Sequence, residues 1–356
     1  MTSILDSRTE IDKLDISHLL GSVESLPDQI ENAWEQTKNL TFPSDYPQVK
    51  NIIVSGMGGS NLGSLVIKHL FKDELTIPME VYPHYHLPGY VSSDSLVLLS
   101  SYSGTTEETL AAAEQAKEVG AKIVVITGGG PLADMARANN WPMYLIDAKY
   151  NPSGQPRMAI GYEVFGQLSM FAKMGLINIS ENEVINLVDK LRQLVKKLGP
   201  EIPNNPAKLL AFRAFDKHII FSAAEHLIGA AHVFNNQVNE NAKSLTTEWH
   251  LPEFNHHFME ALSYPKLAHD TSIFFLFNSG LYHERVQKRF PITKEVLESK
   301  SYETQLIQAT APTKLEQIFE IIQLGQFVSS YLAFLYKIPD PGPVPNVEWF
   351  KTQMTK

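Results

Sequence analysis

From residue 51 to residue 147, short apolar runs alternate with segments whose apolar residues have helical spacing. The runs "NIIVS" (51–55), "SLVLLSS" (95–101) and "KIVVIT" (122–127) are almost continuous in apolar residues. Strands of this kind are buried on both faces, as in a parallel sheet that helices cover on either side. A turn rich in glycine or polar residues follows each run. The pattern predicts a doubly wound α/β unit over about residues 45–150.

The second half of the chain repeats this plan after an intervening helical stretch. The segments 217–227, 272–278 and 303–309 have the composition of strands, and helical segments separate them. Two similar lobes in one chain offer a cleft between them. We therefore predict an α/β fold with two doubly wound parallel-sheet domains and flanking helices. The predicted parts are an N-terminal helical segment 1–44, a first domain 45–175, a helical linker 176–205, a second domain 206–340 and a C-terminal helical tail 341–356.

Charge and cysteine content limit the partners and the chemistry. The net charge is −9 and the pI is near 5.7, which argues against nucleic acid or an anionic membrane as a partner. The absence of cysteine excludes disulfides, thiolate metal sites and a thiol nucleophile. The first fifteen residues carry charges throughout and do not resemble a signal peptide, and no uninterrupted apolar stretch has membrane-spanning length. We expect a cytoplasmic protein that holds any anionic ligand through local groups.

Two turns at the predicted carboxyl edge of the first sheet have unusual compositions, "GMGGSN" (56–61) and "SSYSGTTEE" (100–108). Ligands of doubly wound sheets bind at this edge. Glycines let backbone N–H groups approach a ligand, and a helix N-terminus adds free donors and partial positive charge. Hydroxyl groups add further donors without adding charge, which suits a phosphate monoester in an acidic protein. The predicted phosphate-binding residues are Gly58, Gly59, Ser60, Ser101, Ser103 and Thr106.

A simpler interpretation of the second turn is a capped helix. Thr105 or Thr106 would be the N-cap, and Glu107 or Glu108 would complete a capping box. A cap uses one hydroxyl, whereas four lie around Gly104 on Ser101, Ser103, Thr105 and Thr106, so we favour the phosphate site. The first turn lacks both the lysine of a nucleotide P-loop and the third glycine of a dinucleotide fingerprint. A sugar phosphate is therefore favoured over a nucleotide.

Several motifs together carry a resemblance to a known family. "GMGGS" followed by "SYSGTTEET" resembles the first half of sugar isomerase (SIS) domains. "QPRMAIGY", "NQVNENAKS", "LPEFNHHFMEAL" and "DPGPVPNVEWFK" then match, in order, the landmarks of the bifunctional phosphoglucose/phosphomannose isomerases. The resemblance extends from about residue 45 to the C-terminus. It implies two SIS domains per chain, a homodimer, hexose 6-phosphate substrates and no cofactor.

The resemblance also implies roles for four residues. Glu240 would be the base that moves a proton between C1 and C2, and Arg157 would stabilise the enediolate. His256, contributed across the subunit interface, would open the sugar ring, and Lys351 would assist at the ring oxygen. The residues alone leave simpler alternatives open: a solvated glutamate paired with Lys243, a surface arginine in a loop and a lysine in a solvated tail.

The sequence departs from the family pattern at three positions. Thr105 replaces the asparagine of "SYSGNT", and Asn61 stands where a glycine usually follows "GGS". His257 replaces the second asparagine of "PE-x-NHN". We expect phosphate binding to survive, because the other hydroxyl residues match. We interpret His257 as a partly buried structural histidine.

The histidines near residue 256 do not form a recognisable metal motif. His250, His256, His257 and Glu260 are close in sequence but lack the "HExxH" spacing, so we predict no metal. The predicted activity is the interconversion of glucose 6-phosphate and fructose 6-phosphate, and also of mannose 6-phosphate, through a cis-enediolate. Two alternatives stay open because fold does not determine function. One is another sugar-phosphate isomerase of this fold, and the other is a non-catalytic sugar-phosphate-binding regulator.

Overall fold

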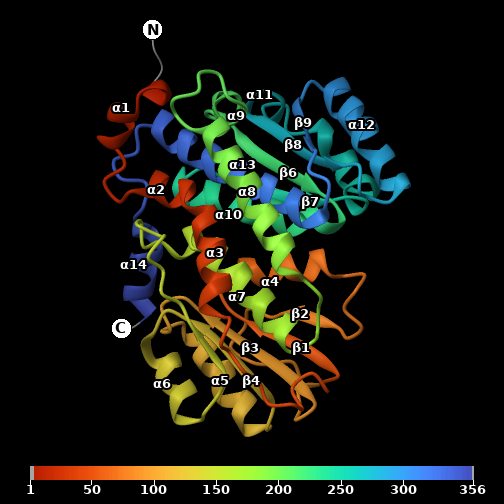
Figure 1. Cartoon of the computed structure of the whole chain (residues 1–356). Helices are drawn as coiled ribbons and strands as arrows, with labels where there is room; N and C mark the ends of the chain where they lie inside the picture. Colours follow the sequence, from red (N-terminus) through yellow and green to blue (C-terminus); the bar gives the residue numbers. More distant parts are fainter. Residues whose placement is uncertain (1–3, 355–356) are drawn as a thin grey trace.

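The computed structural model describes residues 4–354, so residues 1–3 and 355–356 of the predicted terminal segments lie outside it. Two parallel sheets form two lobes, with helices between them (Figure 1). The first sheet has the strand order β2-β1-β3-β4-β5 and the second has the order β7-β6-β8-β9. Every strand pair in both sheets is parallel. The predicted α/β class with two parallel-sheet domains is confirmed.

Each lobe contains alternating strands and helices. The first lobe contains β1 (Asn51–Ser55), α4 (Gly59–Leu70), β2 (Met79–Val81), β3 (Ser95–Ser101), α5 (Glu107–Glu118), β4 (Lys122–Thr127), α6 (Gly130–Ala138), β5 (Met143–Leu145) and α7 (Ile160–Lys173). The second contains α9 (Pro206–Ala214), β6 (His218–Ala223), α10 (Ile228–Asn241), β7 (Thr246–His250), α11 (Ala268–Thr271), β8 (Ser272–Ser279), α12 (Glu284–Ser299), β9 (Glu303–Ala309) and α13 (Lys314–Leu335). Flanking helices are α1 (Arg8–Asp12), α2 (Leu19–Glu24), α3 (Leu26–Gln36), α8 (Glu181–Leu198) and α14 (Pro345–Met354). Short 3-10 helices are η1 (Ile4–Asp6), η2 (Pro156–Met158), η3 (Glu225–Leu227), η4 (Glu253–His256) and η5 (Phe258–Ser263).

Strand β3 shows why an apolar run predicts a central parallel strand. All seven of its residues are buried. Leu96 and Leu98 belong to the large core that reaches the second lobe, whereas Val97 and Leu99 belong to a separate core under α5 and α6. Alternate side chains of a strand point to opposite faces, so both faces of this sheet are covered.

The inner helices join the two lobes. Helices α4 and α7 pack together on the first sheet, and α4 also contacts α10, which packs on α13 of the second lobe. Helix α13 is long and apolar enough to span a membrane, but 83% of its most apolar window is buried inside the protein. It is therefore a core helix. Nearly all of its residues from Leu315 to Phe334 are buried within the chain.

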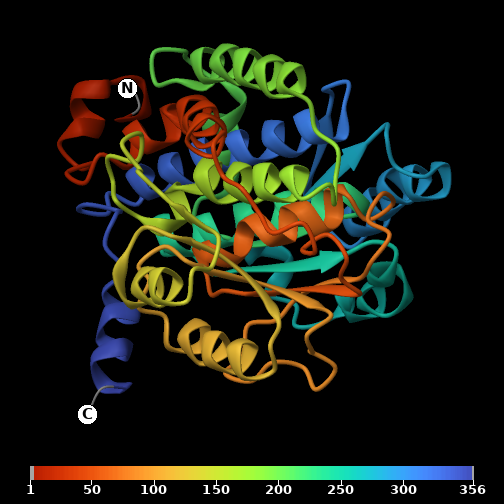
Figure 2. The ribbon, with the colours of Figure 1, turned by 60° about the horizontal axis from the view of Figure 1, so that its bottom comes forward.

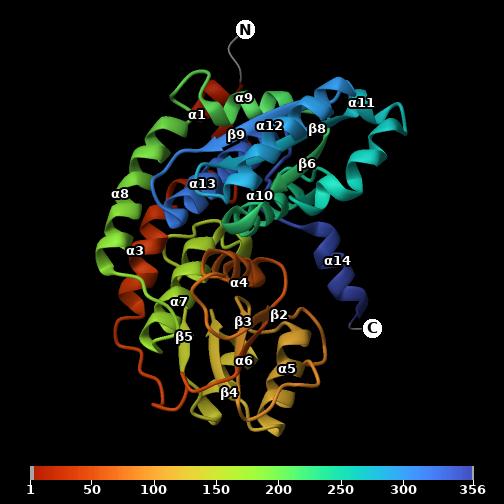
Figure 3. The same ribbon diagram turned by 90° about the vertical axis from the view of Figure 1, so that its right-hand side faces the viewer.

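Two features were not predicted from the sequence pattern. The edge strand β7 follows the end of α10, in a segment for which no strand was expected. Helix α14 projects from the side of the molecule, as the two turned views show (Figures 2 and 3). None of its described residues is buried, and Trp349 and Phe350 are largely exposed.

Candidate active site

A pocket of about 580 Å³ opens beyond the carboxyl ends of β1 and β3. Its walls come from the glycine-rich turn 57–60, the hydroxyl-rich turn 102–108, the segment 155–157, Glu240 of α10 and one side of α14. This is the edge at which doubly wound sheets bind ligands, as the sequence predicted. Segments that are far apart in the chain therefore converge on one cavity.

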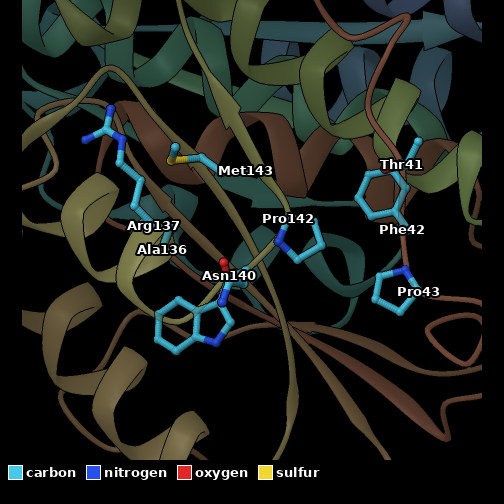
Figure 4. Close-up of a pocket in the computed structure, with 9 residues that line it drawn as sticks. Thr41, Phe42, Pro43, Ala136, Arg137, Asn140, Pro142 and Met143 are labelled. Atoms are coloured by element: carbon cyan, nitrogen blue, oxygen red, sulfur yellow. The ribbon is translucent and has the colours of Figure 1, made fainter.

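A second hollow, of about 640 Å³, has a different character (Figure 4). It lies between residues 41–43 and the chain that joins α6 to β5. Its charged lining residue is Arg137, which pairs with Asp134 at 2.9 Å. Because it holds no set of convergent titratable groups, we place the candidate site in the first pocket.

The hydroxyl-rich turn is held in shape by bonds between its own side chains. The Ser101 and Thr106 hydroxyl oxygens are 2.8 Å apart, and those of Ser103 and Thr105 are 2.9 Å apart. Gly104 has a φ of +69°, and a Cβ there would overlap the carbonyl oxygen of Gly129. Only glycine fits this position, so the turn is locked against the next loop of the sheet.

The capped-helix interpretation does not describe this turn. Thr106 occupies the N-cap position of α5, yet its hydroxyl accepts no hydrogen bond from the backbone of the helix. The backbone N–H groups in the first turn of α5 therefore have no side-chain acceptor. They lie at the N-terminal end of the helix, which borders the pocket. Free donors of this kind, together with the partial positive charge of the helix, can hold an anion.

The glycine-rich turn packs directly on the backbone near Arg157. Gly58 has a φ of +51°, and a Cβ on Gly59 would lie 2.9 Å from the Arg157 backbone nitrogen. Ser60 follows in the first turn of α4, and its hydroxyl oxygen accepts a hydrogen bond from the Tyr102 N–H at 2.9 Å. The two turns are therefore connected, and their relative position is fixed.

The six predicted phosphate-binding residues divide into two groups. Five line the pocket: Gly58, Gly59, Ser60, Ser103 and Thr106. Ser101 is buried behind them, where its hydroxyl oxygen accepts from the Gly104 N–H at 3.1 Å and contacts Thr106. Thr105, which departs from the family pattern, also lines the pocket.

Arg157 is not a surface arginine, because only 1% of its surface is exposed. Its Nε donates to Asn241 Oδ1 at 2.5 Å, and its Nη1 donates to Gln155 Oε1 at 3.0 Å and to Glu240 Oε2 at 3.2 Å. Its Nη2 donates to the carbonyl oxygens of residues 341 and 342 at 3.2 and 2.8 Å. Burial lowers the pKa of Arg157 and the Glu240 carboxylate opposes that change. The guanidinium stays charged, since an arginine pKa starts far above neutrality.

Glu240 lies in the last turn of α10 with its side chain 31% exposed toward the pocket. Lys243 is not its ion-pair partner, contrary to the simpler alternative. The Lys243 ammonium instead donates to the backbone carbonyls of Glu240, Pro341 and Pro343, at 2.5, 3.0 and 2.6 Å. Burial, followed by the nearby Arg157 charge, lowers the pKa of Lys243 to about 8.

Lys351 lines the pocket from α14, but His256 does not line it. His256 is exposed at the end of η4, a 3-10 turn that follows the edge strand β7. One chain therefore brings together Arg157, Glu240 and Lys351 and leaves His256 apart. The interpretation of His257 as a partly buried histidine is wrong: its side chain is 51% exposed and lies 3.4 Å from Glu253.

Sequence reasoning missed the residues that hold the catalytic candidates in place. The carbonyls of Pro341, Gly342 and Pro343 bind Arg157 and Lys243, but a backbone acceptor leaves no signal in a sequence. Across residues 4–354, no group of three or more histidine, aspartate or glutamate side chains has the geometry of a metal site.

Comparisons with known proteins agree with this architecture. Residues 46–147 match the SIS domain family, and residues 203–354 match the bacterial phospho-glucose isomerase C-terminal SIS domain. A bifunctional phosphoglucose/phosphomannose isomerase from Caldicellulosiruptor bescii is 34% identical over 342 residues, which cover 95% of this chain and 99% of that protein. A D-glucosamine-6-phosphate 4-epimerase from Sulfolobus acidocaldarius is 32% identical over 234 residues, 65% of this chain and 71% of that protein.

A solved structure has the same fold over nearly the whole length. A hypothetical protein from Thermus thermophilus superposes with a TM-score of 0.75 at 17% identity, over 99% of this chain and 93% of that chain. Because the aligned residues cover 95% of this chain, the similarity to the Caldicellulosiruptor protein includes both lobes. The chain therefore belongs to the bifunctional phosphoglucose/phosphomannose isomerase family.

Proposed function

We propose that this protein interconverts glucose 6-phosphate and fructose 6-phosphate, and also acts on mannose 6-phosphate, without a metal ion. The observation that carries the proposal is the Glu240 carboxylate, 3.2 Å from the buried Arg157 guanidinium in a pocket that also contains the hydroxyl-rich turn. Proton abstraction next to a carbonyl needs a base, a nearby positive charge and a fixed substrate. These groups supply all three.

The phosphate would bind at the start of α5. Ser60, Ser103, Thr105 and Thr106 line this end of the pocket, and they offer hydroxyl donors beside the free N–H groups of the helix. Binding here would direct the sugar chain toward Glu240. Energy from the phosphate contacts can then hold C1 and C2 close to the carboxylate, where orientation lowers the barrier.

Glu240 would act as the base on the open-chain sugar. It removes the C2 proton of the aldose, the C–H electrons form the C1–C2 double bond, and negative charge develops on O1. The same carboxyl group then delivers the proton to C1, and the O2 proton moves to O1, which gives the ketose. Arg157 supports the negative charge because it cannot lose its own proton at neutral pH. If the enediolate rotates in the site, its opposite face turns toward the carboxyl group. Protonation of C2 on that face would give mannose 6-phosphate.

Ring opening needs a group that donates and accepts protons, and histidine can do both near pH 7. His256 is exposed and lies outside the pocket of its own chain. We propose that the protein is a homodimer in which His256 of the partner subunit completes the site. Lys351 would assist at the ring oxygen from α14.

The test is an NMR assay of the purified protein with fructose 6-phosphate and excess EDTA. Appearance of both glucose 6-phosphate and mannose 6-phosphate supports the full proposal, and glucose 6-phosphate alone removes the second activity. Glu240→Gln should bind the sugar phosphate and turn it over about 10²–10⁴-fold more slowly. Binding by the natural protein without any product would instead favour a sugar-phosphate-binding regulator. A product with an altered C4 configuration would favour an epimerase, which is the activity named for the Sulfolobus relative.

A further inference from the structure

The N–H groups of Arg157 are all engaged by acceptors of the protein. These acceptors are Asn241 Oδ1, Gln155 Oε1, Glu240 Oε2 and the carbonyl oxygens of residues 341 and 342. A guanidinium carries five N–H donors, so these five acceptors match its whole capacity. The buried group can therefore support an enediolate through its charge, but a hydrogen bond to the developing oxyanion has to come from another side chain.

Gln155 is held against this guanidinium. Its Oε1 accepts from Arg157 Nη1 at 3.0 Å, and the same nitrogen donates to Glu240 Oε2 at 3.2 Å. The backbone carbonyl of Gln155 accepts from Asn151 Nδ2 at 3.0 Å, and its backbone N–H donates to Ser153 Oγ at 3.3 Å. The residue is therefore fixed at its backbone and at its amide group, beside the proposed base.

The contact with Arg157 also decides which way the Gln155 amide points. Arginine only donates hydrogen bonds, so the amide oxygen must face the guanidinium and the NH₂ group must face away from it. Gln155 lines the pocket, and no acceptor in the part of the chain that the structure describes binds its Nε2. An amide whose oxygen accepts from a cation is a stronger N–H donor, because linked hydrogen bonds polarise one another. Gln155 therefore offers an oriented donor to a ligand beside Glu240.

We propose that Gln155 is a catalytic residue: its Nε2 donates a hydrogen bond to the enediolate oxygen on which negative charge develops, while Arg157 supplies the positive charge. This inference rests on the proposed isomerase function and deepens it, because it assigns the hydrogen bond and the charge to different side chains. Lys351 can also donate, but it reaches the pocket from α14, whereas Gln155 and Glu240 share one guanidinium nitrogen. A contact that strengthens as charge develops lowers the barrier without tightening the binding of the substrate.

The experiment compares the natural protein with Gln155→Met, Gln155→Glu and a control, Gln193→Met, which replaces an exposed glutamine on α8. It measures kcat and KM for fructose 6-phosphate, and the Ki of a phosphorylated aldonohydroxamate, whose two oxygens resemble those of the cis-enediolate. Gln155→Met should lower kcat about 10²-fold, as the loss of one oxyanion donor does, and should raise the Ki about tenfold more than the KM. Gln155→Glu should also lower kcat, because it keeps an acceptor for Arg157 and has no N–H to donate. Gln193→Met should match the natural protein.

A role confined to holding Arg157 would give a different result. Gln155→Glu would then keep the natural kcat, because a carboxylate accepts from a guanidinium at least as well as an amide does, and this result would overturn the inference. An equal rise of Ki and KM in Gln155→Met would also overturn it, since uniform binding does not lower the barrier. In both cases the natural protein still isomerises the sugar, so the proposed function stands.

Failure of the proposed function would be visible in the natural protein itself. If the natural protein binds fructose 6-phosphate and forms no product, both the proposed function and the role of Gln155 are contradicted. If Gln155→Met does not fold, Gln155→Glu decides through the same comparison of Ki with KM, because it retains the contact with Arg157. A Ki that rises more than the KM supports the donor role, and an equal rise refutes it.

Discussion

Replacing Glu163 by glutamine should stabilise the fold, and the gain should grow with pH. The folded protein favours the neutral acid, since burial raises the pKa of Glu163 from 4.5 to about 8. In the unfolded chain the same group ionises near 4.5. The stabilising effect of the proton is therefore complete below pH 4.5 and is lost as the pH rises through 8. Glutamine has nearly the same shape and cannot ionise, so it avoids this loss.

The size of the effect follows from the two pKa values. One unit of pKa corresponds to about 1.4 kcal/mol, so the full difference is at most about 5 kcal/mol above pH 8. Near pH 7 the expected difference is about 3 kcal/mol, and at pH 5 it is below about 1 kcal/mol. A gain of this size is large against the total stability of a typical domain, which is about 5–15 kcal/mol.

The assay is urea unfolding of the natural protein and Glu163→Gln at pH 5, 7 and 8.5. The exposed control Glu295→Gln follows the same protocol, and the denaturation midpoints and slopes are compared. The midpoints of natural protein and Glu163→Gln should lie close together at pH 5 and separate as the pH rises. Parallel midpoints at all three values would show that Glu163 is ionised in the folded protein, and the reasoning on its neutral form would be refuted.

Three further variants test other parts of the site. Glu240→Gln should lower kcat by about 10²–10⁴ with little change in KM, since it removes a general base but keeps the size of the side chain; an unchanged kcat would exclude Glu240 as the base. Lys243→Met should raise KM about fivefold and expose the chain after residue 340 to proteolysis, because partly exposed charged hydrogen bonds to Pro341 and Pro343 are lost; equal digestion rates would contradict this role. Gly59→Ala should cost about 1–3 kcal/mol in unfolding free energy, since its Cβ meets the Arg157 backbone at 2.9 Å, whereas Gly89→Ala meets no neighbour and serves as its control.

The fold was predictable where a single pattern of apolar residues extends over a whole segment. The apolar runs that became β1, β3 and β4 are buried on both faces, so their composition alone distinguishes them from amphipathic strands. Strand β7 escaped prediction because it lies at the edge of its sheet, and its sequence "TTEWH" alternates between buried and less buried positions. An edge strand pairs with only one neighbour and is less buried than a central strand. It therefore needs fewer apolar residues, and its sequence resembles that of a loop.

The candidate site was predictable in its residue types and not in its contacts. Hydroxyls and glycines around a helix start identify a turn by local chemistry, and most of those residues line the pocket. The burial of Arg157 depends instead on contacts with segments that are distant in the chain. The sequence around Arg157 therefore does not predict it. The separation of His256 from the pocket likewise depends on the tertiary structure and not on the local sequence.

The contacts of Arg157 explain how the candidate base and the C-terminal helix depend on each other. One guanidinium binds the Glu240 carboxylate, the Asn241 amide and the carbonyls of Pro341 and Gly342. A lysine at this place has only three donors on one atom and could not satisfy acceptors spread around a plane. The segment 341–343 leads directly into α14, so any movement of this helix changes the acceptors of Arg157. The charge that supports the enediolate in our proposal and the wall that carries Lys351 are therefore set by the same group of hydrogen bonds.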